Sequence, residues 1–342
     1  MSVTHAPKRT HTLQIHVTRK CNLKCLHCYS SSGPEHEDAL DLDHLKEAVT
    51  DAKDLGFTFV TLSGGEPFLY PGMKDILAHA KALGLRTATV TNGMFLDKRR
   101  LEALKDHIDL IVVSLDGAPE RHNRMRANPS AFEVMARKIP ALRESGIPFG
   151  FLFTLSRDNA HELDWAADFA AESGAVMLQV HPLDTDVGRA AETGAFDGLD
   201  PDETAAIFAG RRAFEAQKRL EGRLTIVVDY RPRLPEDQKP QIASCGGQPS
   251  FADLVSTLCI ETDGSFTPMG HGFSREFVLG RLGEGRLMEQ AKAWVETGTA
   301  RCYADLVKRV RQAADAEHAP LVQNMAQTLR RASLQTAAIA AE

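Results

Sequence analysis

Three cysteines stand close together near the N-terminus, in the run Cys21-Asn22-Leu23-Lys24-Cys25-Leu26-His27-Cys28. Thiolates this near in sequence can share one iron–sulfur cluster, and a cubane cluster usually takes four cysteines. Because the run supplies three, one iron would keep an open position, which is typical of a reactive metal centre rather than a structural one. The alternative is a zinc site with His27 or His36 as the fourth ligand.

Glycine-rich or polar groups follow several strand-like runs. Gly64-Gly65-Glu66-Pro67 combines glycines, which let a ligand approach the backbone, with a carboxylate that suits an ammonium group. Taken alone, this segment is better interpreted as a simple turn. Asn92, Ser114 and Asp116 also follow strands, where such side chains can hold a ribose, although each is individually compatible with a loop cap.

The elements that must position these groups alternate between strand and helix. Strands are expected at residues 13–18, 57–62, 86–90, 110–114, 148–154 and 176–180. The first helix is expected to begin at an Asp43 cap, and a later apolar pattern predicts one helix over residues 132–142. This order predicts a parallel α/β barrel or a doubly wound sheet, and both place active sites at the carboxyl ends of the strands.

The composition changes after about residue 182. Asp184–Asp200 is expected to be a loop, followed by a helix over residues 202–220 and a strand over 224–228. Tyr230–Ser244 contains three prolines and is interpreted as a linker, and the chain from about Ala304 has a helical, alanine-rich pattern. We therefore expect an N-terminal tail (1–11), a barrel (12–230), a smaller domain (231–310) and a helical tail (311–342).

Charge and composition argue against some classes of function. The net charge of −6 and the small numbers of tyrosine (4) and tryptophan (2) argue against a nucleic-acid-binding surface. The sequence has no apolar run of about 18 residues and no apolar signal core at its start, so it predicts a cytoplasmic protein without a membrane partner. Six cysteines in a reducing compartment indicate metal or redox chemistry rather than disulfides.

Over roughly residues 12–182 the chain resembles the radical SAM superfamily. The resemblance rests on the run Cys21–Cys28 with His27 before the last cysteine, on Gly64–Pro67, and on Ser114–Gly117. It implies a partial (β/α)6 barrel of the TIM type, with a [4Fe–4S] cluster on the first loop and S-adenosylmethionine on the open iron. It also implies reductive cleavage of S-adenosylmethionine to a 5′-deoxyadenosyl radical, which abstracts hydrogen from a substrate.

The same resemblance implies roles for individual residues. Gly64–Pro67 would bind the methionyl amino group, and Arg126 could pair with the methionyl carboxylate, although a solvated loop charge is an equal alternative for Arg124 and Arg126. The cluster ligands would be Cys21, Cys25 and Cys28, and the candidates for cofactor binding are His27, Gly64, Gly65, Glu66, Pro67, Asn92, Ser114, Asp116 and Arg126. The implied partner is an electron donor of the flavodoxin or ferredoxin type.

The region from Cys245 onward resembles an eroded form of the SPASM or twitch extension of radical SAM enzymes. Met269 stands where the full motif has cysteine, and a hairpin is predicted to turn at Asp263-Gly264. The resemblance implies at most one auxiliary iron–sulfur cluster on Cys245, Cys259 and Cys302, with substrate, water or His271 as the fourth ligand. The alternative is three scattered buried thiols, since free cysteine is readily buried as a small apolar residue.

The resemblance to enzymes of this kind is compatible with several classes of substrate. The favoured interpretation is maturation of a ribosomal peptide or natural-product biosynthesis. Modification of tetrapyrrole (haem-type) side chains and dehydrogenation of a small molecule are the alternatives within the same chemistry. From another class, a non-catalytic regulator that binds zinc or a cluster on the barrel scaffold is also considered.

Overall fold

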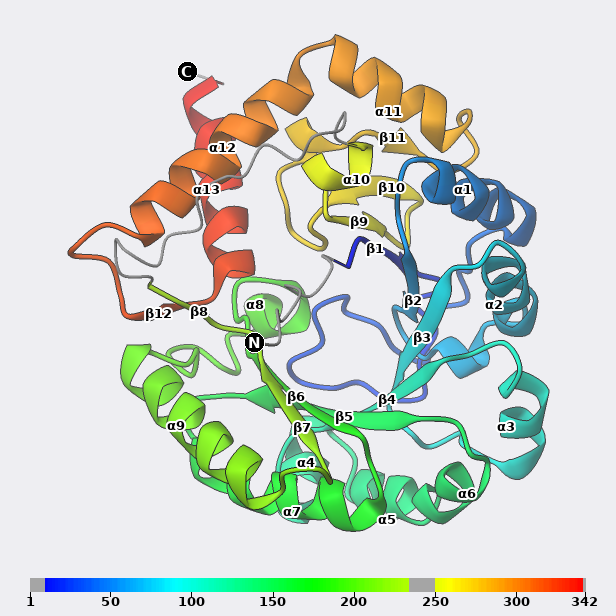
Figure 1. Ribbon diagram of the computed structural model, residues 1–342, viewed down its shortest axis with the longest axis vertical. Helices are drawn as coiled ribbons and strands as arrows, with labels where there is room; N and C mark the ends of the chain where they lie inside the picture. The colour runs from blue at the N-terminus through cyan, green and yellow to red at the C-terminus, as the bar shows by residue number, and fades with distance from the viewer. Residues whose placement is uncertain (1–9, 234–249, 341–342) are drawn as a thin grey trace, which may run out of the picture.

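A curved sheet of mostly parallel strands forms the centre of the computed structural model, with helices around its outer side (Figure 1). The structure describes residues 10–233 and 250–340. Cys245 and most of the expected linker lie outside these ranges. None of the helices in the described ranges has the length and apolar character that crossing a bilayer requires.

The expected strand order is confirmed. The strands β1 to β6 pair in parallel in chain order, and β7 adds a further parallel strand beside β6. Their bounds are Thr12–His16, Phe59–Ser63, Arg86–Thr91, Leu110–Leu115, Phe149–Leu155, Met177–Pro182 and Thr225–Val228. Among the described residues the order ends at β7 on one side and at β11 on the other, so the fold is a partial barrel.

The strands after the gap at residues 234–249 extend the same sheet. β9 (Thr257–Ile260) pairs in parallel with β1, and β10 (Ser265–Pro268) and β11 (Gly280–Arg281) follow in antiparallel order. The predicted hairpin with its turn at Asp263-Gly264 is therefore present. Because one ten-stranded sheet crosses the boundary expected near residue 230, the division into two domains stays a prediction.

Helices and short strands complete the structure. The helices are α1 (Leu42–Asp54), α2 (Met73–Ala82), α3 (Lys98–Leu104), α4 (Pro119–Met125), α5 (Ala131–Ala136), α6 (Ile139–Glu144), α7 (Leu163–Ser173), α8 (Gly188–Thr193), α9 (Glu203–Arg219), α10 (Phe251–Leu254), α11 (Leu287–Glu296), α12 (Thr299–Ala314) and α13 (Met325–Ala340). The two-residue strands β8 (Arg231–Pro232) and β12 (Val322–Gln323) pair with each other.

Three local expectations were wrong. The first helix is capped by Asp41 rather than Asp43, because the Asp41 side chain accepts the backbone N–H of His44. The helix expected over residues 132–142 is divided into α5 and α6, with Pro140 in the first turn of α6, because proline has no N–H and its ring obstructs the preceding turn. The expected loop after residue 182 contains α8.

The alternation of side chains along each strand separates the core from the site. On β1, Leu13 and Ile15 are fully buried in the main hydrophobic cluster, together with Leu45 and Val49 of α1. Gln14 alternates with these residues and so faces the inner side of the curved sheet. Burial of each such aliphatic side chain contributes about 1.5–3 kcal/mol, so the outer layer stabilises the barrel and leaves its inner side for polar residues.

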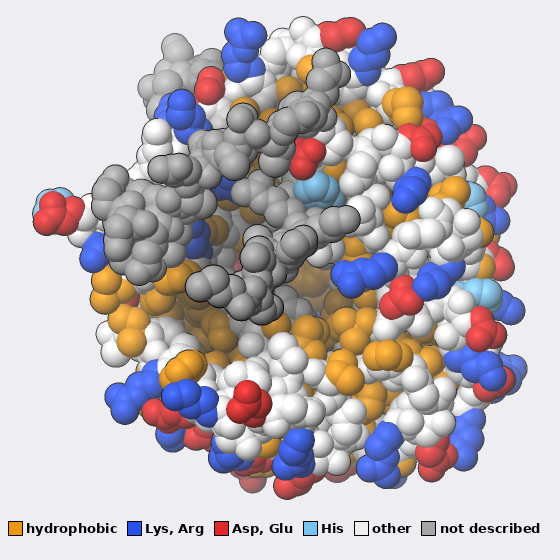
Figure 2. Space-filling view, in the orientation of Figure 1, with side chains coloured by type: hydrophobic (Ala, Val, Ile, Leu, Met, Phe, Trp, Pro, Cys, Tyr) orange, Lys and Arg blue, Asp and Glu red, His pale blue; other side chains and the backbone are white. Residues whose placement is uncertain are grey.

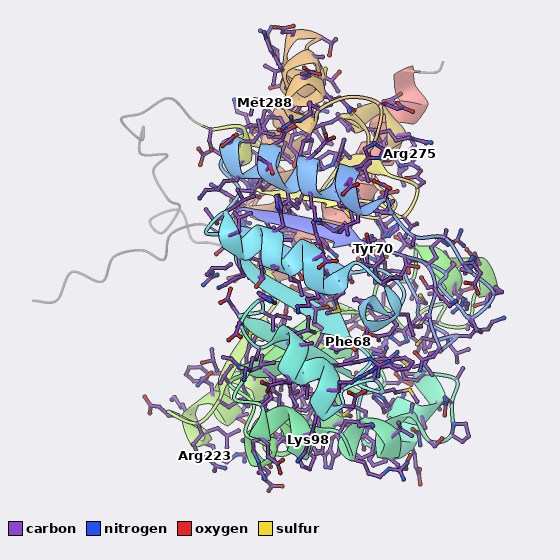
Figure 3. The ribbon with its side chains drawn as sticks, turned by 90° about the vertical axis from the view of Figure 1, so that its right-hand side faces the viewer. Phe68, Tyr70, Lys98, Arg223, Arg275 and Met288 are labelled. Atoms are coloured by element: carbon purple, nitrogen blue, oxygen red, sulfur yellow. The ribbon has the colours of Figure 1, made fainter. Side chains whose placement is uncertain are left out.

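The side view separates the two ends of the strands (Figure 3). Arg223, which precedes β7, lies toward the left edge, and Arg275, which pairs with Glu261 directly after β9, lies toward the right. The loops that follow the parallel strands therefore gather on the right in this view. The cysteine run, the Gly64–Glu66 turn, Asn92 and Asp116 belong to these loops. Ser114 lies within β4, Cys259 within β9 and Cys302 within α12.

Candidate functional site

The loop after β1 brings the three cysteines of the run together. Cys21 and Cys25 are 7% and 8% exposed, and they form an apolar cluster with Leu23, against which Cys28 and Met94 pack. The loop returns on itself where the Cys21 N–H donates to Gly33 (3.1 Å). In Figure 1 this blue loop lies within the ring of strands.

Each of the three sulfurs accepts hydrogen bonds from nearby donors. Cys25 Sγ lies 3.7 Å from Nη1 of Arg126, and Cys28 Sγ lies 3.3 Å from the backbone nitrogen of Ser32. The Leu23 N–H donates to Cys21 Sγ over 3.4 Å. Donors aimed at sulfur favour thiolate ligands, and hydrogen bonds to the sulfurs are among the features that set the potential of an iron–sulfur cluster.

Burial keeps the thiols of Cys21 and Cys25 protonated while no metal is bound. It raises the pKa of Cys21 to about 12 and that of Cys25 to about 11, although Arg126 opposes the shift at Cys25. Metal binding must therefore displace protons here. No three His, Cys, Asp or Glu side chains within residues 10–233 and 250–340 are arranged to hold a single metal ion. In a cubane cluster each thiolate binds a different iron, so the thiols need not converge on one point.

The histidines of the zinc alternative have other partners. His27 Nε2 lies 3.7 Å from Oδ2 of Asp116. His36 Nε2 lies 3.2 Å from a guanidinium nitrogen of Arg19, and His36 Nδ1 lies 3.8 Å from Asp38. These contacts favour the three-thiol interpretation over a zinc site completed by either imidazole.

The Gly64–Glu66 turn fits against the start of the cysteine loop. The Gly65 N–H donates to the carbonyl of Thr18 (2.7 Å), and the Glu66 N–H donates to the carbonyl of Lys20 (2.9 Å). A Cβ added to Gly65 would lie 2.3 Å from the Lys20 carbonyl oxygen, so only glycine permits this approach. Pro67 follows as the first residue of a short 3₁₀ helix.

The Glu66 carboxylate is fully buried and accepts bonds from the chain itself. Oε1 accepts from the Thr91 hydroxyl (2.8 Å) and the Phe68 N–H (3.1 Å), and Oε2 accepts from the Asn92 N–H (2.9 Å). Burial raises the pKa of Glu66, although these donors oppose the shift. Glu66 therefore joins the ends of β2 and β3, and it positions Asn92, whose Nδ2 donates to Asn22 of the cysteine loop (2.8 Å).

Asp116 and Arg126 form a buried ion pair beside the cysteines. Arg126 Nε donates to Oδ2 of Asp116 (2.6 Å) and Nη2 donates to Oδ1 (3.2 Å). Burial alone would raise the pKa of Asp116, but the Arg126 charge outweighs it and holds the pKa well below the ordinary range. The Arg126 charge is thus balanced by Asp116, whereas the sequence suggested a carboxylate of the cofactor. Arg124, by contrast, is 63% exposed and pairs with Asp158.

Ser114 is the last residue but one of β4, two residues before Asp116, and is 7% exposed. Contacts with the cysteine loop or with one another join seven of the cofactor-binding candidates, namely His27, Gly64, Gly65, Glu66, Asn92, Asp116 and Arg126. What the sequence could not reveal is that several of these groups bind one another.

The second set of cysteines is divided. Cys259 is fully buried on β9, with its sulfur 3.6 Å from Nδ1 of His16, and His16 stacks on His271 at a ring distance of 4.4 Å. Cys302 is exposed on α12, where it lines a surface hollow with Asp305 and other residues of α12 and α13. The structure does not bring these two thiols together, and Cys245 lies outside the described residues.

Sequence reasoning missed several residues of the site. The Tyr29 hydroxyl lies 2.7 Å from the Ser63 hydroxyl and accepts the Gly64 N–H, which fixes the cysteine loop to the end of β2. Its position next to Cys28 was the available signal. Arg189 of α8 also contacts the loop, and no pattern in the polar segment around it indicated this.

Comparison with known proteins identifies the barrel. Residues 15–170 match the radical SAM superfamily. These residues belong to the radical SAM superfamily. The AdoMet-dependent heme synthase of Methanosarcina barkeri is 30% identical over 235 residues, which are 67% of this chain and 65% of that protein. The PqqA peptide cyclase of Methylorubrum extorquens is 31% identical over 234 residues, which are 64% and 58% of the two chains. The chain thus spans less than two thirds of either relative.

Solved structures agree with the fold. The structure of anSMEcpe with bound AdoMet superposes with a TM-score of 0.65 and 17% identity, and the match covers 96% of this chain and 97% of that one. The radical SAM superfamily uses a [4Fe–4S] cluster and S-adenosylmethionine. The residues of this radical SAM domain fit such a cluster, because three clustered thiols with hydrogen-bond donors at their sulfurs provide a suitable ligand set.

Proposed function

We propose that the protein is a radical SAM enzyme whose cluster is held by Cys21, Cys25 and Cys28. The observation that carries this proposal is the gathering of these thiols beside the Gly64–Glu66 turn. When bound, the cluster and S-adenosylmethionine supply a 5′-deoxyadenosyl radical that abstracts hydrogen from the substrate. An external one-electron donor of the flavodoxin or ferredoxin type and a cytoplasmic location belong to the same proposal.

The chain's own residues would shape the reaction in three ways. The Gly64–Glu66 turn offers the backbone carbonyl of Gly65 to the methionyl amino group, whereas those of Gly64 and Glu66 accept bonds from Ser30 and Leu69. Asp116 orients Arg126, which in turn donates to the sulfur of Cys25 and holds its position. Asn92 and Ser114 offer polar side chains for the ribose.

We propose a ribosomal peptide as the substrate. The guanidinium group of Arg126 is bound by Asp116, so its charge is already balanced and is not offered to a propionate. Gln14 on the inner side of β1 uses its Nε2 on His16 (2.9 Å), and its amide oxygen suits an N–H group of a peptide backbone. A tetrapyrrole is the second candidate, because a heme synthase is among the relatives.

Anaerobic reconstitution tests the chemistry. The wild-type chain should bind about four irons at the barrel site and release 5′-deoxyadenosine from S-adenosylmethionine when reduced. Cys25→Ala should abolish that release, and normal release in this variant would refute the cluster assignment. A zinc-loaded protein without cleavage would favour the regulator alternative. Supplying a candidate precursor peptide or an iron porphyrin, and following the mass of each, separates the two substrates.

We also propose an auxiliary cluster that includes Cys259, although Cys302 lies apart from this thiol in the structure. This proposal predicts that Cys259→Ala lowers the iron content while cleavage of S-adenosylmethionine continues. Unchanged iron would instead assign Cys259 to the buried contact with His16.

A further inference from the structure

The short helix α8, which follows the residues that match the superfamily, binds the cysteine loop. Residue Arg189 of α8 donates through Nη1 to the carbonyl of Cys25 (2.8 Å) and through Nη2 to the carbonyl of Ser32 (2.7 Å). Its backbone N–H donates to the carbonyl of Cys28, also over 2.8 Å. One residue therefore binds three carbonyls of the loop, two of which belong to the cysteines assigned to the cluster.

The residue before it makes this approach possible. Gly188 has φ +56, and a Cβ added there would lie 2.2 Å from the Cys28 carbonyl oxygen and 2.4 Å from that of Tyr29. Any other residue would push the two backbones apart. The contact thus depends on a glycine and an arginine in direct succession.

The segment that carries α8 is anchored on its other side. Arg330 of α13, whose side chain is 6% exposed, pairs with Asp184 (2.9 Å) and Asp186 (2.8 Å). Ala190 of α8 is fully buried in a small cluster with Met125 and its neighbours. Because α13 and the Met125 cluster hold this segment in place, Arg189 restricts the movement of the cysteine loop instead of moving with it.

The charge of Arg189 differs in its surroundings from that of Arg126. Arg126 is neutralised by Asp116, whereas the side chain of Arg189 binds neutral carbonyl groups. A guanidinium group stays charged at any ordinary pH. A positive charge held close to an iron–sulfur cluster stabilises its more negative, reduced form, so it raises the reduction potential.

We propose that Arg189 is a positioning residue that fixes the spacing of Cys25 and Cys28 and raises the reduction potential of the cluster between them. This inference rests on the proposed function, since it assumes a cluster on these thiols. It assigns a task to α8, which lies outside the matched residues 15–170.

A redox titration of the full chain tests the effect on potential. Wild type, Arg189→Gln and Arg189→Lys are loaded with iron and sulfide without oxygen, and the reduced cluster is followed by electron paramagnetic resonance. Arg211→Gln is the matched control, because Arg211 is 78% exposed on α9 and pairs with Glu215. At a fixed applied potential, the reduced-to-oxidised ratio of Arg189→Gln should fall tenfold, which corresponds to about 59 mV for one electron.

The lysine variant and the control complete this comparison. Arg189→Lys retains the charge and should recover most of the lost potential, and Arg211→Gln should match wild type. Equal potentials in wild type and Arg189→Gln would overturn the proposal. If wild type itself binds no cluster, the proposed function fails instead, so the two failures are distinguishable.

Hydrogen exchange of the unloaded chain gives a second readout that needs no cluster. Amides of residues 21–33 should exchange faster in Arg189→Gln and in Arg189→Lys than in wild type, while those of β4 stay unchanged. If Arg189→Gln does not fold, Arg189→Lys alone decides the positioning role. Wild-type exchange of the loop in that variant would overturn it.

Discussion

Replacing Arg126 by methionine should strongly destabilise the unloaded protein. Asp116 has no exposed surface, and Arg126 binds both of its carboxylate oxygens. Removing one partner of a buried ion pair leaves an uncompensated charge, which costs about 3–5 kcal/mol. Arg126→Met should therefore lower the free energy of unfolding by about this amount at neutral pH.

The loss should also depend on pH. In wild type the pKa of Asp116 lies below its ordinary value, so the stability that the pair provides is already present at pH 5 and changes little up to pH 8. In the variant, burial without the guanidinium raises the pKa of Asp116, so stability is lost as the pH rises through that value. The difference in the free energy of unfolding between Arg126→Met and wild type should therefore be larger at pH 8 than at pH 5.

Urea unfolding followed by circular dichroism measures these differences. Arg100→Met is the control, because Arg100 and Asp97 form an ion pair whose side chains are 36% and 35% exposed, and its loss should cost less than about 1 kcal/mol. The double variant that carries both Arg126→Met and Asp116→Asn should lose less unfolding free energy than the two single variants lose in sum. A cost for Arg126→Met no larger than that of the control would refute the reasoning about the buried pair.

Three other substitutions test the site. Glu66→Gln should lower the free energy of unfolding of the unloaded chain by about 1–3 kcal/mol, because an amide NH2 group replaces one carboxylate oxygen. Either the Thr91 hydroxyl or the Asn92 N–H then faces a donor instead of an acceptor. It should also weaken S-adenosylmethionine binding in equilibrium dialysis, and unchanged stability would contradict the structural role. Gly65→Ala should reduce iron loading because its Cβ meets the Lys20 carbonyl, whereas Gly210→Ala, with open space around it, should load normally. Burial lowers the pKa of His122 to about 4. As the pH falls below 6.5, this imidazole is therefore protonated in the unfolded chain but not yet in the folded one, which favours unfolding. His122→Gln should therefore remove about 3 kcal/mol of the stability lost between pH 7 and pH 4 in thermal or urea unfolding, and equal losses in both proteins would refute this.

The sequence predicted the barrel well because strand-like apolar runs and helical apolar patterns are local signals. All six expected strands are present within a few residues, and the glycine-rich turn and Asn92 lie at strand ends as expected. Pro140 divided one expected helix, and this too was visible in the sequence, since the residue is a known helix breaker.

The pairings within the site could not be predicted in the same way. Asp116 was interpreted as a ribose ligand because residue type and position do not reveal that Arg126 binds it. Arg189 was missed because it lies 164 residues from Cys25 and binds backbone carbonyls, which leave no signature in side-chain type. Its helix is a single short element whose buried face is Ala190, so no apolar period marked it.

The pairing of β9 with β1 has a consequence for synthesis of the chain. Cys259 on β9 and His16 on β1 are separated by 243 residues. At about 5–20 residues per second, the ribosome needs on the order of 10–50 s between making the two strands. Until then β1 is paired with β2 alone. The cysteine loop therefore follows a strand whose other edge has no hydrogen-bonding partner. If iron and sulfide reached the nascent chain, the cysteine loop would not yet be supported by the pairing of β1 with β9. This favours assembly of the cluster after the chain has left the ribosome.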